Sequence, residues 1–323
     1  MSDKYEIFLD GGHHVVLGRG GGGAVYKYRV KATQTTVAVK ELGNFGISIQ
    51  KRREEIETWK KIKNHPNVVS LLDSWEEGEV IRAVMPLALG SLESLVFSLA
   101  RAQDNPDVGD LIFHDSQMLL NMSMMVLEGM SHLHNSSPAI IHRDLKPQNI
   151  LYFLEQGRIV LKIADFGISK SLEGTMNAQT HDIGTAEFQA PEVLQCSSVM
   201  LSSEKYSTEV DLWSLGLVLH FLVMAELPPF KNFDTFSQEN IDNDFDGEWF
   251  GDPLYKNDRT VEKIKIIIKG MLVLDKNKRI SVDEALLKMR MDIEVIIIIS
   301  LFVVCTVPAG PGGEPSSGLL SAC

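Results

Sequence analysis

Two short polar segments constrain this chain more than any other feature. The first is IHRDLKPQN at 141–149, and the second, ADFG at 164–167, places Asp165 21 positions after Asp144. Asp144 is a carboxylate able to accept a hydroxyl proton, Lys146 is a cation, and Asn149 has an amide oxygen for a metal. Asp165 adds a carboxylate for the metal, and the following glycine lets the backbone turn. The pair predicts a catalytic site that combines a proton acceptor with a metal.

A glycine-rich segment near the N-terminus predicts a phosphate-binding loop. Gly18, Gly20 and Gly23 belong to the run GRGGGGAV at 18–25. Glycine has no Cβ, so its backbone N–H groups can approach a phosphate closely. Lys40 ends the strand-like run VAVK at 37–40, and we expect its ammonium group to face a phosphate. Four consecutive glycines at 20–23 raise the entropy cost of ordering this loop.

Further motifs follow in order, with APE at 190–192, DLWS at 211–214 and then Arg279. Together with the segments above, they resemble the eukaryotic protein kinase superfamily, Ser/Thr type, over residues 13–292, with no subgroup indicated. The resemblance implies an α+β, bilobal protein-kinase fold. We expect a small, mainly antiparallel β N-lobe with one key helix at 13–90, and a larger, mainly α C-lobe at 91–292. Residues 1–12 would be an N-terminal extension, and 293–323 a terminal segment.

Local patterns agree with this division into lobes. β-Branched residues predict strands in the first part of the chain, and apolar residues at helical spacing predict helices after position 91. One helix is expected in the first lobe, with Ser48 as its cap. The expected strands are 13–17, 24–30, 35–41, 68–75 and 80–85, and the expected helices are 48–63, 92–99, 118–134, 212–224, 261–274 and 281–289.

The resemblance assigns roles to the residues of the two opening segments. Asp144 would be the catalytic base, and Lys146 would neutralise the transferred phosphoryl group. Asn149 and Asp165 would bind Mg²⁺ through hard oxygens. Thr185 matches the threonine that supports the base and the lysine in Ser/Thr kinases. The sequence after Asp144 also resembles the Ser/Thr-directed form.

The resemblance also implies an ATP site. Lys40 would contact the α- and β-phosphates, and of three glutamates on the following helix the family pattern selects Glu55 as its partner, ahead of Glu54 and Glu57. Met85 occupies the gatekeeper position, and the adenine would bond to the Pro86 carbonyl and the Ala88 backbone. The residues expected to hold ATP are Gly18, Gly20, Gly23, Val25, Ala38, Lys40, Glu55, Met85, Pro86, Ala88 and Leu151.

Three further motif residues are expected to be structural. Glu192 and Arg279 would form a buried ion pair, and Asp211 would hold the backbone of the catalytic loop. A regulatory role is expected for Arg143, because a guanidinium group binds phosphate bidentately. The hypothesis is that Thr175 or Thr180 is phosphorylated and orders the activation segment, and the alternative is a solvated Ser/Thr-rich loop.

Composition limits partners and location. The net charge of −12 argues against a nucleic-acid-binding role, which needs clustered Lys and Arg. Three scattered cysteines fit a reducing cytoplasm, where we place the protein. The apolar stretch 295–307 is thirteen residues long, and a helix of that length spans only ~20 Å of a ~30 Å hydrocarbon core. We expect it either to pack on the domain or to belong to an alternative-splice or gene-model tail, and the Pro/Gly/Ser-rich residues after it to be disordered. The alternatives are a weak membrane anchor and an exposed strand.

The expected function is that of a Mg-ATP-dependent serine/threonine protein kinase. Its cofactors would be ATP and Mg²⁺, and its partners protein substrates with Ser or Thr hydroxyls. The alternative is a pseudokinase or ATP-binding scaffold with little turnover. Lys40, Asp144 and Asp165, whose loss would indicate a pseudokinase, are all present. A small-molecule kinase is disfavoured by the complete APE segment at 190–192.

Overall fold

We analysed a computed structural model of the chain. The structure describes residues 3–20, 23–43, 48–103, 115–165, 186–196, 207–226, 237–238, 241 and 258–291. Among the site residues expected above, Thr185 lies outside these ranges, as do Thr175, Thr180 and the apolar stretch 295–307. Over the described residues, the helices are all too short or too polar to cross a membrane.

The first part of the chain forms one antiparallel sheet. Its strands follow the order β1–β5–β6–β8–β7, and β4 also pairs with β5. Strand β5 pairs with β6 through Val25↔Lys40, and β6 pairs with β8 through Ala38↔Met85. This register brings the glycine-rich segment, Lys40 and the gatekeeper position onto neighbouring strands. The strands are β1 (Tyr5–Ile7), β4 (Val16–Gly20), β5 (Gly23–Val30), β6 (Thr36–Leu42), β7 (Asp73–Glu77) and β8 (Val80–Pro86).

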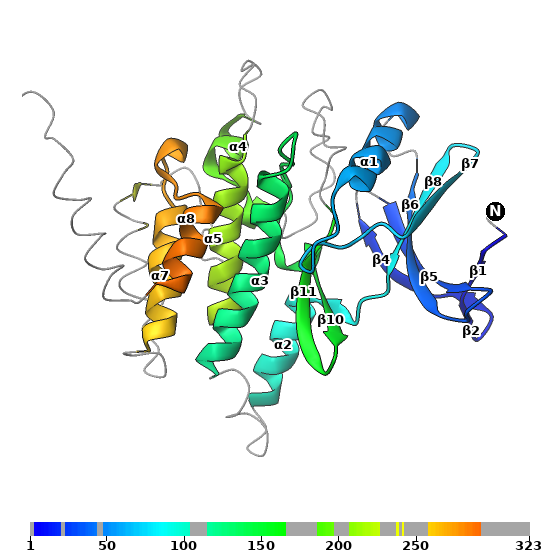
Figure 1. The fold of residues 1–323 in the computed structure, drawn as a ribbon, viewed down its shortest axis with the longest axis horizontal. Helices are drawn as coiled ribbons and strands as arrows, with labels where there is room; N and C mark the ends of the chain where they lie inside the picture. Colours follow the sequence, from blue (N-terminus) through cyan, green and yellow to red (C-terminus); the bar gives the residue numbers. More distant parts are fainter. Residues whose placement is uncertain are drawn as a thin grey trace, which may run out of the picture.

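Helix α1 (Ile49–Lys61) packs beside this sheet (Figure 1). The Ser48 side chain accepts a hydrogen bond from the Lys51 N–H at 3.3 Å, which satisfies one free N–H group of the first turn. The helix buries Glu55, Ile56 and Trp59 and leaves Glu54 and Glu57 exposed. The single expected helix of the N-lobe is therefore present, with its apolar face inward.

One strand prediction is wrong at its start. The stretch 68–75 was expected to be continuous strand, but β7 begins only at Asp73. Val68 and Val69 lie in a loop that bonds to the second part of the chain. The Val69 N–H donates to the Ile163 carbonyl at 2.8 Å, and the Trp59 indole donates to the Val69 carbonyl at 2.9 Å. These partners outcompete pairing with β8, although the residues have strand propensity.

The second part of the chain is mainly helical. Helix α5 (Glu209–Met224) lies between α3 (Ser116–His134) and α7 (Arg259–Met271), with α8 (Val282–Arg290) packed on α3 and α7 (Figure 1). Nearly the whole of α5 is buried, which explains why its sequence is apolar on every side. The helices α2 (Leu92–Gln103) and α4 (Pro191–Cys196) flank this core.

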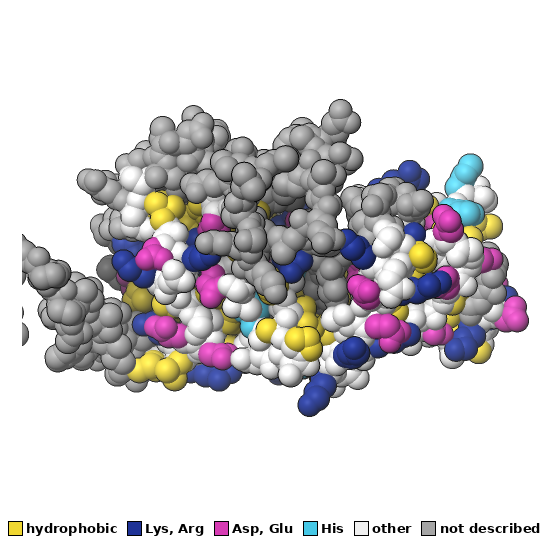
Figure 2. Space-filling view, turned by 90° about the horizontal axis from the view of Figure 1, so that it is seen from above, with side chains coloured by type: hydrophobic (Ala, Val, Ile, Leu, Met, Phe, Trp, Pro, Cys, Tyr) yellow, Lys and Arg dark blue, Asp and Glu magenta, His cyan; other side chains and the backbone are white. Residues whose placement is uncertain are grey.

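A small sheet connects the two parts. It has the order β11–β10–β9. Strand β9 (Gly90–Ser91) follows the expected adenine-binding hinge at 85–88, and β10 (Ile150–Glu155) follows the catalytic loop at 141–149. Strand β11 (Arg158–Ile163) leads to Asp165. The hairpin β10–β11 thus explains the spacing between the two opening segments, because it carries the chain out and back. The α+β bilobal fold is confirmed. On the face shown in Figure 2, acidic and basic side chains are interspersed over the described surface.

Candidate active site

The catalytic loop brings three of the expected residues into contact. The Asn149 Nδ2 donates to the Asp144 carbonyl at 2.7 Å and to its Oδ2 at 3.2 Å. The Lys146 Nζ lies 3.4 Å from the same Oδ2, and both charged side chains are about five-sixths buried, at 16% exposure each. Partial burial strengthens this attraction relative to an exposed pair. Asp144 is therefore held in place by an amide and a cation.

His142 joins this loop to the segment that contains Asp165. Its ring is fully buried, and its Nε2 donates to the Ala164 carbonyl at 2.9 Å. Its Nδ1 accepts the Asp144 N–H at 3.4 Å, and the Ala164 N–H donates to the Asn149 carbonyl at 2.9 Å. Burial lowers the pKa of His142, so the ring is neutral and serves as both donor and acceptor. The two segments identified from the sequence thus form one hydrogen-bonded unit.

Asp211 fixes the backbone of the same loop by hydrogen bonds. This buried carboxylate, on α5, accepts the His142 N–H at 2.7 Å and the Arg143 N–H at 2.8 Å. It also accepts from His134 Nε2 at 2.9 Å, at the end of α3. Arg143 has a positive φ of 64°, a conformation that these bonds stabilise. The expected contact of Asp211 with the backbone of the catalytic loop is therefore present. The contribution of His134 was not expected from the sequence, where its place at the end of a predicted helix is the only available signal.

Lys40 contacts carboxylates from two distant segments. Its Nζ forms an ion pair with Asp165, and it lies 3.9 Å from Glu55 Oε1. Burial by itself lowers the pKa of Lys40, but the carboxylates of Asp165 and Glu55 outweigh it and raise the pKa. The ammonium group is therefore charged. Of the three candidate glutamates, only Glu55 is paired with Lys40 among the ion pairs of the described residues.

Asp165 occupies a left-handed backbone conformation, with φ of 59°. This conformation is uncommon for a residue other than glycine and is stabilised where the surroundings hold it. Here the Asp165 carboxylate is held by Lys40, and the preceding residue is fixed by His142 and Asn149. The side chain of Asp165 is 44% exposed, which leaves carboxylate surface available to a ligand.

The glycines of the loop fall into two kinds. A Cβ at Gly18 or Gly20 would meet no protein atom within 4 Å, so packing does not require glycine there. Gly23 has φ of 135°, and a Cβ would lie 2.0 Å from the Glu41 carbonyl oxygen. Gly23 is therefore demanded by the fold, whereas Gly18 and Gly20 keep open space beside the strand, which suits a phosphate.

The expected adenine pocket combines residues from both parts of the chain. Ala38 and Met85 are buried on paired strands, while Val25 and Leu151 are partly buried and pack against the same core. Leu151 comes from β10, directly after the catalytic loop. Pro86 ends β8, and Ala88 follows it in the connection to β9. This connection is fixed at its far end by the Leu89 N–H, which donates to the Tyr152 carbonyl at 3.0 Å.

The donor set fits Mg²⁺-ATP. Asn149 and Asp165 carry oxygen donors on adjacent backbone, and Mg²⁺ prefers such ligands. The Lys40 ammonium pairs with Asp165, so it lies beside the carboxylate expected to bind the metal and could also contact a phosphate. Among the described residues, no cluster of three or more His, Cys, Asp or Glu side chains forms a protein-only metal site.

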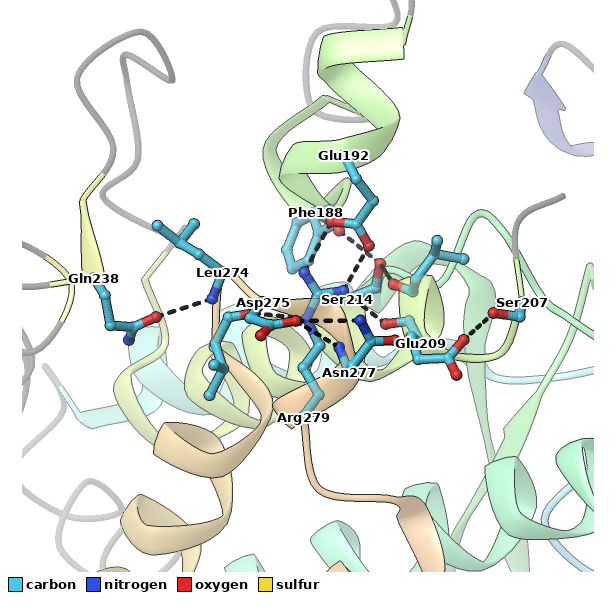
Figure 3. Close-up of polar contacts among 12 residues, drawn as sticks. Phe188, Glu192, Ser207, Glu209, Ser214, Gln238, Leu274, Asp275, Asn277 and Arg279 are labelled. Atoms are coloured by element: carbon cyan, nitrogen blue, oxygen red, sulfur yellow. Dashed lines mark hydrogen bonds and ion pairs between the residues drawn. The ribbon is translucent and has the colours of Figure 1, made fainter. Parts of the chain in front are cut away.

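The ion pair expected between Glu192 and Arg279 is present (Figure 3). Arg279 donates from Nη1 and Nη2 to the two carboxylate oxygens of Glu192 at 2.7 and 2.8 Å, and its side chain is fully buried. It also donates to the carbonyls of Val273 and Glu209, both at 2.8 Å. Ser214 donates to the Phe188 carbonyl at 2.7 Å beside it. These contacts fix the segment after Thr185 onto α5.

Comparison with known proteins agrees with this arrangement. The family described as protein kinase domain matches residues 13–289. The chain is 31% identical over 268 residues to a probable myosin light chain kinase of Dictyostelium discoideum, which covers 81% of this chain and 69% of that protein. It is 29% identical to the serine/threonine-protein kinase nekl-2 of Caenorhabditis elegans, over 84% of this chain and 71% of the other. A calcium/calmodulin-dependent protein kinase type IV of Rattus norvegicus is 30% identical over 88% of this chain and 54% of the other.

Proposed function

The chain belongs to the protein kinase family and is a protein serine/threonine kinase, and from this premise we propose that it transfers the γ-phosphoryl group of Mg²⁺-bound ATP to Ser or Thr hydroxyls of other proteins. The observation that carries the proposal is the junction of three distant segments. Lys40 pairs with Asp165, and His142 and Asn149 bond the Asp165 segment to the loop of Asp144. These contacts support the proposal that Lys40 holds phosphate, Asp165 binds the metal and Asp144 is the base.

The catalytic loop supplies the proton acceptor. Asp144 accepts the proton of the substrate hydroxyl as the oxygen attacks, and its orientation is fixed by Asn149 Nδ2. Lys146 lies 3.4 Å from this carboxylate, so its ammonium stabilises negative charge on the transferred group as it passes. Neither residue forms a covalent bond to the phosphoryl group.

The N-lobe supplies the nucleotide contacts. Mg²⁺-ATP, when bound, would supply the phosphoryl group with ADP as the leaving group, and the metal would offset part of the phosphate charge. Asn149 and Asp165 would hold the metal, and Lys40 would hold the phosphates beneath the backbone of Gly18 and Gly20. Glu55 keeps the Lys40 ammonium charged and aimed at the site. The adenine would lie between the apolar side chains of the two lobes and bond to the hinge.

The proposed partners are proteins in the cytoplasm that carry Ser or Thr. The residues after Asp144 and the threonine at 185 favour a Ser/Thr hydroxyl, and the net charge of −12 disfavours nucleic acid as a partner. The names of the similar proteins include serine/threonine-protein kinase, which supports the same substrate class.

We further propose control by phosphorylation of the activation segment. Arg143 directly precedes the base, and its backbone is fixed by Asp211, so a phosphate bound by its guanidinium would act close to Asp144. Thr175 and Thr180 are the proposed acceptors. Phosphopeptide mapping of the active enzyme should find phosphate on one of them, and active enzyme without phosphate at 169–180 would refute this control.

Transfer of radiolabelled phosphate from ATP to generic protein substrates tests the function. Asp144→Asn should lower kcat by about 10²–10⁴-fold while nucleotide binding is retained, because only the proton acceptor is lost. Asp165→Asn should abolish Mg²⁺-dependent nucleotide binding. Glu57→Gln likewise replaces a carboxylate by an amide, on a side chain of α1 that is 58% exposed, and should leave transfer unchanged. Purified protein that binds Mg²⁺-ATP but transfers no phosphate would overturn the proposal in favour of a scaffold.

A further inference from the structure

The chain before the family-matched region is part of the N-lobe sheet. The match begins at residue 13, but Tyr5–Ile7 already form strand β1. Strand β1 pairs antiparallel with the end of β5 through Tyr5↔Val30 and Ile7↔Tyr28. Strand β4 pairs with the start of the same strand, up to Gly20↔Gly23. One edge of β5 is therefore shared between the N-terminal segment and the strand that carries the glycine loop.

Side chains of this segment join the two edges of the sheet. The Tyr5 ring is 7% exposed and stacks on Trp75 with a centroid distance of 5.3 Å and an interplanar angle of 7°. The Tyr5 hydroxyl donates to Asp73 Oδ2 at 3.1 Å, and the Lys4 ammonium contacts the same oxygen at 3.1 Å. Asp73 and Trp75 lie on β7, at the far end of the strand order from β1. We call Lys4, Tyr5, Asp73 and Trp75 the N-terminal clasp.

The clasp is connected to the glycine loop by a short hairpin. Strands β2 (Leu9–Asp10) and β3 (His13–His14) follow β1 and lead directly into β4 (Figure 1, dark blue). Both ends of the hairpin bond to Lys27 on β5. The Phe8 N–H donates to the Lys27 carbonyl at 3.0 Å, and the Lys27 N–H donates to the Val15 carbonyl at 2.9 Å. Phe8, which precedes the family-matched region, also accepts the Val15 N–H at 3.4 Å and so helps to fix the start of β4.

Few other contacts hold the strand that leads into the glycine loop, so its bonds to the N-terminal segment matter for the position of the loop. All five residues of β4 are exposed, so no core packing holds this strand. It pairs only with β5 in the described sheet, and its register shifts between Val16 and Gly18. Four glycines follow at 20–23, which maximises the conformational freedom lost when the loop closes on a phosphate.

We propose that the N-terminal clasp positions the glycine loop for ATP and that Tyr5 is its main positioning residue. The inference rests on the proposed ATP site. Loss of the clasp frees the beginning of β4, so more backbone must be ordered when nucleotide binds. The catalytic base and Lys146 lie together in the other lobe, on the loop that follows α3. The effect therefore falls on ATP affinity, and the rate of the chemical step stays the same.

Nucleotide titration and steady-state kinetics on the full chain test the proposal. Tyr5→Ala should raise the Kd and KM for ATP by roughly 5–30-fold, which corresponds to ordering about one additional residue, and should change kcat by less than about twofold. Tyr5→Phe keeps the ring on Trp75 and loses only the bond to Asp73, so its effect should be smaller but measurable. Glu6 lies on the same strand, and its exposed side chain is 3.8 Å from that of Arg29, outside the clasp. Glu6→Ala should therefore leave the KM for ATP unchanged.

Thermal denaturation separates positioning from a purely structural role. If both tyrosine variants lower Tm but leave ATP affinity unchanged, the clasp only stabilises the sheet and the proposal is wrong. A fall in kcat at constant KM would also overturn it. Should Tyr5→Ala fail to fold, Tyr5→Phe decides between the outcomes. Direct nucleotide binding needs no turnover, so an enzyme that proves inactive still tests the clasp, and failure of phosphate transfer remains a separate result.

Discussion

The buried pair of Arg279 and Glu192 gives the sharpest stability prediction. Arg279→Met keeps much of the volume of the side chain but removes its charge and all of its donors. Glu192 then loses both bidentate bonds, and the carbonyls of Val273 and Glu209 lose their donors as well. Removing one partner of a buried ion pair costs about 3–5 kcal/mol, because the remaining charge is left uncompensated.

A second arginine in the same chain provides the matched control. Arg290 also pairs with a glutamate at 2.9 Å, Glu128 on α3, but these side chains are 60% and 36% exposed. Water screens that pair, and Arg290→Met should cost about 0–1 kcal/mol. For chains of ~150–250 residues, 1 kcal/mol shifts Tm by about 2–4 °C. We therefore expect Tm to fall by roughly 6–20 °C for Arg279→Met and by at most about 4 °C for Arg290→Met.

Differential scanning calorimetry or thermal denaturation followed by circular dichroism measures both variants. The double variant Arg279→Met/Glu192→Leu should be more stable than Arg279→Met alone, because it has no unpaired carboxylate, although two backbone carbonyls still lack donors. Equal shifts in Tm for Arg279→Met and Arg290→Met would refute the reasoning that burial decides the value of an ion pair here. Activity lost in Arg279→Met at high temperature would not indicate a chemical role for Arg279.

Two further predictions concern backbone strain and pH. Gly23→Ala should lower the free energy of unfolding by at least about 1–3 kcal/mol, because φ is 135° and the Cβ would lie 2.0 Å from the Glu41 carbonyl. Gly20→Ala should leave Tm unchanged but weaken ATP binding. Equilibrium denaturation and nucleotide titration measure both variants. A loss of stability in Gly20→Ala with unchanged ATP affinity would contradict the distinction between a glycine required by the fold and one that leaves space for phosphate. Burial lowers the pKa of His220 in α5 to about 4, below its unfolded value of 6.5, so this group favours folding above pH 6.5 and disfavours it as pH falls towards 4. Denaturation at several pH values should show that the free energy of unfolding falls by up to roughly 3 kcal/mol between pH 6.5 and 4 because of this residue. The His220→Leu variant should show a weaker pH dependence. An unchanged pH dependence in this variant would refute the role of His220.

Much of the fold was predictable because local signals were strong. Ser48 followed by Ile56 and Trp59 at helical spacing predicted the helix of the N-lobe, and the structure places it at Ile49–Lys61. The strand β1 was missed, since three residues carry too little pattern to identify. It is stabilised by Asp73 and Trp75, which lie 68 or more positions away, and sequence spacing gives no information about such partners.

The residues of the candidate site could be named from the sequence, but their contacts could not. The motifs named Asp144, Lys146, Asn149 and Asp165, and the structure brings them together, while their chemical roles stay predictions. The role of His134 was not predictable, because its bond to Asp211 spans 77 positions and depends on how α3 crosses α5. Thr185 lies outside the described residues, and its role stays a prediction.

The identity of the chemical groups in this kinase, and their order along the chain, follow from its sequence alone. Which of these groups meet depends on how the chain folds. Lys40 and Asp165 are 125 positions apart, and Glu192 and Arg279 are 87 apart. Closing loops of that length costs chain entropy, which a local motif cannot offset. Burial of the helices around α5 and of the N-lobe sheet supplies that free energy, and so these contacts exist only in the folded molecule.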